Sequence, residues 1–197
     1  MEFGEFIGGI QTVDLLIVLY FMVFFVLGFA QGTIRRVIGI GSILFSFLLA
    51  ANVAIPLGTF LGNNWTQFPR EYAFMVGFLA VFLAAALAFA LVAQGFYNPQ
   101  PLFAKARFVD EALGGILGVV QAGLILGFLV IILGSFFLVP GIAPDPQELP
   151  GLRSLWTALD GSNIVAVFRD TLIPAFFAIS GYLIPDSIEV YFPGASA

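Results

Sequence analysis

Four long apolar stretches alternate along the chain with short segments that hold most of the charged residues. The stretches cover residues 13–29, 37–57, 72–94 and 113–139, and their central parts contain no ionisable side chain. A helix rises about 1.5 Å per residue, so about 20 apolar residues cross the roughly 30 Å hydrocarbon core of a bilayer. The pattern predicts an all-α integral membrane protein with a bundle of four transmembrane helices.

The last part of the chain has a different pattern. Residues 140–150 are rich in proline, and residues 164–184 form another apolar stretch that Arg169, Asp170 and Pro174 interrupt. On a helical wheel these two charges lie away from the main apolar face, which holds Ile164, Phe168, Leu172, Phe176 and Ile179. We predict a C-terminal amphipathic helix at the membrane interface, because charged groups are costly at membrane depth. A fifth span is the alternative, since the length suffices.

This division predicts two parts. Residues 1–139 form a four-span transmembrane domain, and residues 140–197 form a Pro-rich segment followed by the interfacial helix. The acidic start of the chain lacks the basic n-region of a cleaved signal peptide, so we expect the first span to be retained.

Composition excludes several classes of chemistry. The chain of 197 residues is 60% hydrophobic and 10% charged, and it contains neither cysteine nor histidine. Thiolate catalysis, disulfides, histidine bases and Cys or His metal sites are therefore excluded. A net charge of −5 argues against nucleic-acid binding, because that binding depends on clustered Lys and Arg side chains. We expect no catalytic residue, no cofactor and no metal, and hence a protein that is not an enzyme.

The span interiors offer little for ion transport. Their polar side chains are serines and amides (Ser42, Ser46, Asn52, Gln121 and Ser135). Pumps and ion-coupled transporters usually carry ionisable groups at membrane depth. A small transporter or channel is therefore the weaker alternative.

Small residues recur at helical spacing in three of the spans. Such residues let helix backbones approach closely within a membrane. The predicted packing residues are Gly39, Ser42 and Ser46 in the second span, Gly77, Ala80 and Ala84 in the third, and Gly114, Gly118, Gly123 and Gly127 in the fourth. Because the glycines of the fourth span lie on two opposite faces, we expect it to be the central helix.

Basic residues predict the topology. The loops before the second and fourth spans hold Arg35, Arg36, Lys105 and Arg107, whereas Arg70 is the one basic residue of the loop between them. Basic residues near span ends are retained in the cytoplasm. We predict that these two loops lie inside and that both termini lie outside the cytoplasm.

Charges of opposite sign meet at that predicted cytoplasmic face. Arg35 and Arg36 begin the second span, and Asp110 and Glu111 begin the fourth at a similar depth. We predict an ion-pair cluster of these four side chains. In the simpler alternative, the arginines only set the topology and the acids only complement the dipole of their own helix.

Three motifs together resemble the CvpA family of colicin V production proteins. Asp14 opens the first span, GFAQGTIRRVIG at residues 28–39 joins the first two spans, and VDEALGGILGVVQAG at residues 109–123 opens the fourth. Glu111 departs from the family pattern, which has a basic residue after the aspartate. The resemblance implies a bacterial inner-membrane protein linked to colicin V production or export, and more generally to envelope homeostasis.

We therefore expect a non-enzymatic membrane protein that acts in the lipid bilayer through other envelope proteins. A structural or assembly subunit of a larger membrane complex is the alternative, favoured by the large side chains of the first span and by the apolar tail. Assembly into a homo-oligomer is a further alternative that the sequence leaves open.

Overall fold

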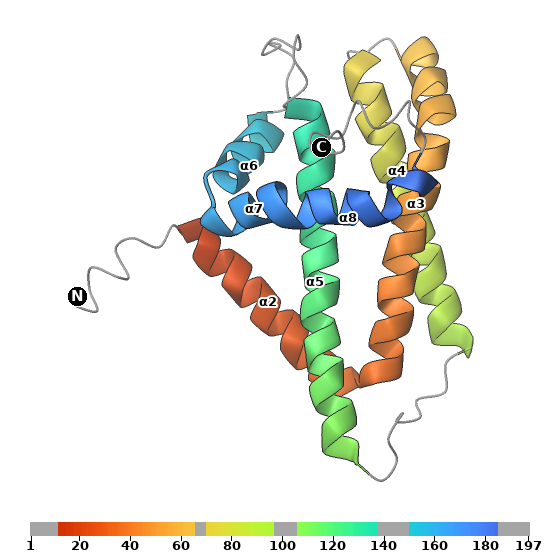
Figure 1. The fold of residues 1–197 in the computed structure, drawn as a ribbon. Helices are drawn as coiled ribbons and strands as arrows, with labels where there is room; N and C mark the ends of the chain where they lie inside the picture. The colour runs from red at the N-terminus through yellow and green to blue at the C-terminus, as the bar shows by residue number, and fades with distance from the viewer. Residues whose placement is uncertain (1–11, 66–69, 97–105, 138–149, 185–197) are drawn as a thin grey trace, which may run out of the picture.

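The structure is a computed structural model that describes residues 12–65, 70–96, 106–137 and 150–184. These residues form helices almost throughout and contain no strand within those ranges (Figure 1). In chain order the elements are α2 (Thr12–Gln31), α3 (Thr33–Asn64), α4 (Arg70–Phe96), α5 (Arg107–Phe137), α6 (Pro150–Asp160), α7 (Asn163–Val167), the π-helical turn η1 (Phe168–Leu172), α8 (Ile173–Ser180) and the short 3-10 helix η2 (Gly181–Leu183).

The predicted fold class is confirmed. The four predicted spans lie in α2, α3, α4 and α5, each long and apolar enough to cross a membrane, and the segment Asn163–Leu183 also meets both criteria. The protein is thus an all-helical, multi-pass membrane protein. Residues 138–149, with most of the predicted Pro-rich segment, and Lys105 lie outside the described residues.

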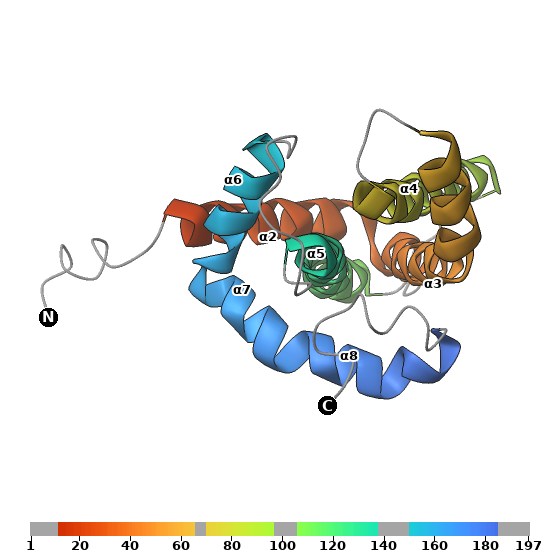
Figure 2. The ribbon, with the colours of Figure 1, turned by 90° about the horizontal axis from the view of Figure 1, so that it is seen from above.

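Helix α5 is the central helix, as the sequence predicted. It contacts α2, α3, α4, α6 and η1. Figure 2 shows α5 nearly end-on, with α2 above it in the picture, the α3–α4 pair to the right and the arc of α7 and α8 below. Helix α2, the α3–α4 pair and the arc of α7 and α8 therefore lie on different sides of α5.

Helices α3 and α4 form a closely packed pair. A Cβ atom built on Gly58 would lie 3.0 Å from the Cα of Phe74, and one built on Gly77 would lie 3.3 Å from the backbone nitrogen of Gly58. The two backbones approach closely because neither glycine has a side chain. This contact includes Gly77, one of the predicted packing residues.

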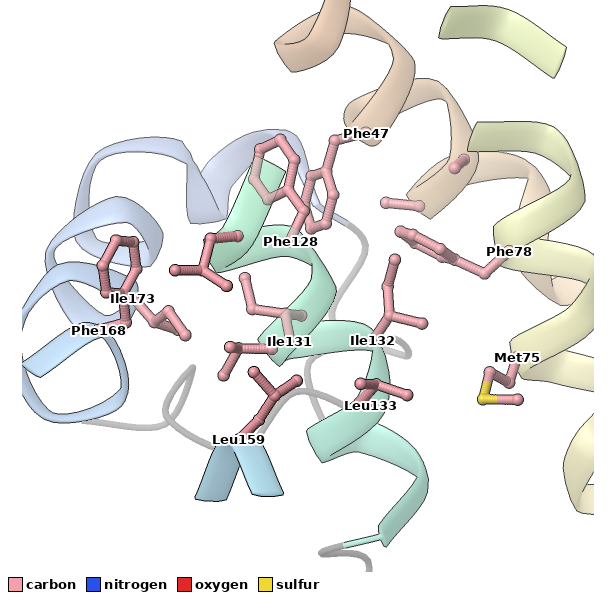
Figure 3. Close-up of a cluster of buried hydrophobic side chains, with 14 of the residues drawn as sticks. Phe47, Met75, Phe78, Phe128, Ile131, Ile132, Leu133, Leu159, Phe168 and Ile173 are labelled. Carbon is pink, nitrogen blue, oxygen red and sulfur yellow. The ribbon is translucent and has the colours of Figure 1, made fainter. Parts of the chain in front are cut away.

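An aromatic cluster joins the second half of α5 to its neighbours (Figure 3). The phenylalanine cluster consists of Phe47, Phe78, Phe128 and Phe176, from α3, α4, α5 and α8. The rings of Phe47 and Phe128 stack with centroids 4.0 Å apart, and Phe78 meets Phe47 edge-on at 5.4 Å. Four helices thus interlock through one set of rings.

The C-terminal helical segment, residues 163–183, runs across α5 and not alongside it, as both views show (Figures 1 and 2). We call it the crosswise segment. It begins beside the first turn of α2 and ends near α3, where Asn52 Nδ2 donates to the Leu183 carbonyl at 3.4 Å. Arg169 contacts Asp160 and Asp170 on its exposed side.

The predicted apolar face of this segment is only partly correct. Phe168 is buried as predicted, but Leu172 and Ile179 are exposed, while Ile173 and Phe177 are buried in their place. The reason is the π-helical turn, in which the backbone N–H of Ile173 bonds to the carbonyl of Phe168 five residues earlier. This wider turn rotates the following residues relative to a regular helix.

Candidate functional site

Three glycines bring the backbones of α2 and α5 into contact. A Cβ built on Gly28 would lie 2.2 Å from the carbonyl oxygen of Gly114, and one on Gly118 would lie 2.2 Å from that of Phe24. These glycines, Gly28, Gly114 and Gly118, form the glycine crossing. Because the opposing atoms belong to backbone and not to a movable side chain, this contact requires glycine at these positions.

The turn between α2 and α3 is fixed against the first turn of α5. Gly32 has a φ of +74°, which L side chains rarely adopt, and a Cβ there would lie 2.6 Å from the Asp110 carboxylate. The Thr33 hydroxyl donates to the backbone carbonyl of Asp110 at 2.9 Å. Asp110 and Thr33 are both buried. This arrangement positions the beginning of α3 and the two arginines that follow.

The predicted ion-pair cluster is not formed. No ion pair joins Arg35 or Arg36 to Asp110 or Glu111, all of which the structure describes. Glu111 instead accepts from Arg107 Nε, four residues earlier in the same helix, at 2.8 Å. Arg36 points toward Gln121, farther along α5, and its Nη1 donates to the Gln121 side-chain oxygen at 2.7 Å. The acids lie at the first turn of α5, whereas the partner of Arg36 lies about three turns later.

Arg36 lines a cavity of about 630 Å³ between α3, α4 and α5, which we call the Arg36 cavity. One part of its wall is polar and the other part is apolar. The polar part consists of Gln31, Arg35, Arg36, Ser42 and Gln121. The apolar part includes Phe82, Ala86, Ala90 and Ile125. The cavity reaches the protein surface, because Arg35 on its polar wall and Leu83 and Ala90 on its apolar wall are exposed.

Asp14 connects the beginning of α2 to the beginning of the crosswise segment. Its carboxylate accepts from the Ser162 hydroxyl, from Asn163 Nδ2 at 3.2 Å and from the Ile164 backbone N–H at 3.4 Å. Asp14 is 7% exposed and Ser162 is 1% exposed. We call this contact the Asp14 lock. Sequence reasoning assigned Asp14 no partner, although the serine and asparagine before an apolar helix were a possible capping signal.

The second glycine face of α5 meets a side chain and not a backbone. Cβ atoms on Gly123 and Gly127 would lie 3.8 Å and 3.6 Å from the ring of Phe168, which are ordinary contact distances. An apolar cavity of about 510 Å³ lies beside this contact, between α5 and the crosswise segment. The two glycine faces of α5 therefore differ in how closely their neighbours approach.

The other predicted packing residues are divided between contacts and surface. Gly39 faces the Gln121 side chain, and Ser46 is fully buried and donates to the Ser42 carbonyl at 2.7 Å. Ala80 and Ala84 are exposed, so the structure does not place them between helices. Between residues 73 and 93 of α4, the buried small residues are Ala73, Gly77 and Ala85.

The Arg36 cavity thus offers a buried cation, an amide and a hydroxyl beside an apolar wall. Among the described residues, no group of three Asp, Glu, His or Cys side chains is placed to hold a metal ion. The cavity is accordingly suited to binding an anion attached to an apolar group.

Comparison with protein families identifies the family of this chain. The sequence model of a family described as "Colicin V production protein" matches residues 13–171, well over half of the chain. No curated protein matches significantly, and neither does any solved structure. The matched range includes the glycine crossing, the Arg36 cavity and the Asp14 lock.

Proposed function

Because the chain belongs to the family of colicin V production proteins, we propose that it acts in the bacterial inner membrane without catalysing a reaction, through protein partners of the envelope. Its role would be in toxin production or export and in envelope homeostasis. The family resemblance supports the role, and the exposed face of α2 supports the mode of action.

Helix α2 is the observation that carries this proposal. Of its 20 residues only Asp14, Ile17 and Gly28 are buried. Its outward face is large and apolar and includes Leu16, Leu19, Met22, Val23 and Val26. Because the glycine crossing and the Asp14 lock already hold α2 in place, this face is available for the helix of another membrane protein.

A deletion strain tests the role. We expect loss of the gene to sensitise cells to detergent or bile, and the wild-type chain to restore resistance. A chain with Leu16, Met22 and Val23 replaced by alanine should accumulate normally but fail to restore it. The matched control replaces Leu87, Leu91 and Val92, which are exposed on α4 and do not line the Arg36 cavity. Equal rescue by both triple variants would contradict a partner surface on α2.

A structural subunit of a larger complex is the second candidate. The crosswise segment exposes Ile179 and Tyr182 at 76% and 85%, an apolar and aromatic edge beyond its contact with α5. Native mass measurement after mild solubilisation tests this role. A stable hetero-complex is expected, and a lone monomer or homodimer would exclude it.

The proposed topology puts the start of α5 inside the cell and α6 outside. The chain has no cysteine, so single cysteines can be labelled with an impermeant thiol reagent. Ser154 and Ala106 are exposed at these two places. We expect Ser154→Cys to react in intact cells and Ala106→Cys to react only after permeabilisation. The reverse pattern would invert the topology.

The crosswise segment would lie along the outer membrane surface. Twenty residues of α2 extend about 30 Å, which is just enough to cross the hydrocarbon core. The Asp14 lock supports this position, because it joins the start of the crosswise segment to the first turn of α2, where α2 would enter the bilayer. Arg169 and the exposed Asp170 would then reach headgroups and water. Rapid labelling of Asp170→Cys in intact cells is expected, and protection of this cysteine by lipid would favour a fifth span.

A further inference from the structure

Arg36 carries a buried positive charge that no carboxylate of the described residues neutralises. The residue is 5% exposed, its Nη1 donates to the neutral amide of Gln121, and its buried Nε has no hydrogen-bond partner among the described residues. The ring of Phe24, 5.8 Å from the guanidinium carbon, provides only a cation–π contact. A guanidinium stays protonated in proteins, and a buried charge without a counter-charge is strongly unfavourable. Among the described residues, no anion therefore balances the charge of Arg36.

The charges around Arg36 do not supply that anion. Arg35 is its neighbour on the same wall of the cavity and adds a second positive charge. Asp110 lies against Gly32 at the α2–α3 turn, and Glu111 pairs with Arg107. The polar part of the Arg36 cavity is consequently cationic.

The rest of the cavity has the opposite character. Ala86, Ala90 and Phe82 of α4 and Ile125 of α5 form an apolar wall of the cavity that Arg35 and Arg36 also line. Ala90 is exposed, and it lies on a helix long and apolar enough to cross a membrane. A free inorganic anion would fill the cationic part and leave this wall in contact with water. A molecule that joins an anionic group to a hydrocarbon chain satisfies both parts.

We propose that the Arg36 cavity binds an anionic phospholipid, with its phosphate at Arg35 and Arg36 and one acyl chain along the alanines of α4. A guanidinium presents its donors in a planar fork that matches phosphate oxygens. The volume of about 630 Å³ is within the usual range for small-molecule sites. Basic pockets between transmembrane helices are suited to lipid headgroups.

Lipid titrations of the purified full chain in mild detergent test this site. Phosphatidylglycerol, phosphatidylcholine and inorganic phosphate are added separately, and binding is followed by native mass spectrometry and by the unfolding temperature. We expect phosphatidylglycerol to bind and to raise the unfolding temperature more than the other two. If inorganic phosphate stabilises the protein as strongly as phosphatidylglycerol, the cavity binds a free anion and the lipid assignment is wrong.

Charge variants locate the phosphate. Arg36→Gln should weaken phosphatidylglycerol binding about tenfold or more, the value of one lost charge-assisted hydrogen bond. Arg35 is exposed, so Arg35→Gln should leave the fold intact and weaken binding severalfold. Arg107→Gln removes the same charge from the same end of the molecule but outside the cavity, and should leave binding unchanged. If Arg107→Gln and Arg35→Gln weakened phosphatidylglycerol binding equally, general surface charge would explain the effect and the proposal would be overturned.

A steric variant locates the acyl chain without changing any charge. Ala90→Phe fills the apolar part of the cavity, whereas Ala84→Phe adds the same ring at an exposed position of α4 outside the lining. We expect only Ala90→Phe to lower phosphatidylglycerol binding. Full binding by Ala90→Phe, with Arg35→Gln also unaffected, would overturn the proposal even if Arg36→Gln does not fold.

Discussion

The two halves of α5 are held by opposite kinds of packing. In its first half, Gly114 and Gly118 let the backbone of α2 come within contact distance. In its second half, Phe128 interlocks with Phe47 of α3, Phe82 of α4 and Phe176 of α8. Within a bilayer, lipid tails are as apolar as the side chains, so close packing and not exclusion from water favours helix association. The molecule achieves that packing once by removing side chains and once by fitting large ones together.

The phenylalanine cluster should show the largest effect. Phe47 is fully buried and touches Phe78, Phe128 and Phe176, so Phe47→Ala leaves a cavity that three rings surround. We expect the free energy of unfolding to fall by about 3 kcal/mol, which is the lower end of the usual range for replacing a buried phenylalanine by alanine. The loss should be at the lower end because the apolar surface exposed on unfolding contacts lipid and not water. Denaturant unfolding in mild detergent measures this loss. Phe60→Ala on the same helix, at 63% exposure, should be close to neutral, and a similar loss there would contradict the cluster's role.

The glycine crossing should be nearly as sensitive to a single methyl group. In Gly118→Ala the new Cβ would lie 2.2 Å from the Phe24 carbonyl, and only a shift of α2 can relieve this overlap. Overpacking of this kind typically costs about 1–3 kcal/mol, and we expect about 2 kcal/mol. The same unfolding measurement applies. Gly41→Ala is the control, since nothing lies within 4 Å of that position.

The glycine crossing and the phenylalanine cluster differ in how far the sequence could predict them. Gly114 and Gly118 recur at helical spacing, so the existence of a small-residue face on α5 could be derived from the chain alone. Its partner could not, because the opposing atoms are backbone atoms that any sequence would present. Phe47 and Phe128 are two of 24 phenylalanines, and nothing in the local pattern distinguishes buried rings from lipid-facing ones.

The candidate site was predictable only as a set of charges. The sequence singled out Arg36 and Asp110, but their opposite sign suggested a pair that the structure does not form, since Arg36 donates to Gln121. The Asp14 lock joins residues about 150 positions apart, and the π-helical turn at Phe168 rotates the crosswise segment after its start. Both depend on tertiary contacts, which the local pattern of hydrophobic and polar residues does not encode.

The Asp14 lock should show an intermediate effect, since it is a polar contact between two packed regions. Asp14→Ala leaves the Asn163 side chain and the Ile164 N–H without this acceptor. Losing a buried hydrogen-bond partner costs about 1–3 kcal/mol, so we expect a fall of that size in the free energy of unfolding. Asp170→Ala, an exposed acid in the same segment, should have little effect. If the two variants were equally stable, the lock would contribute nothing to holding the crosswise segment.

The smallest effect on the free energy of unfolding is expected at Gly123, on the face of α5 opposite the glycine crossing. Gly123→Ala makes the same change as Gly118→Ala, five residues later, but its Cβ would lie 3.8 Å from the Phe168 ring, an ordinary contact. Alanine favours a helix interior over glycine by roughly 0.5–1 kcal/mol, so this variant should be neutral or slightly more stable than the wild type by the same unfolding measurement. If Gly118→Ala lowers the free energy of unfolding and Gly123→Ala does not, then backbone contact, and not glycine content, makes the α2 face of α5 sensitive to an added methyl group. A loss at Gly123 as large as that at Gly118 would mean that both faces are packed with equal closeness, which contradicts the distances at Phe168.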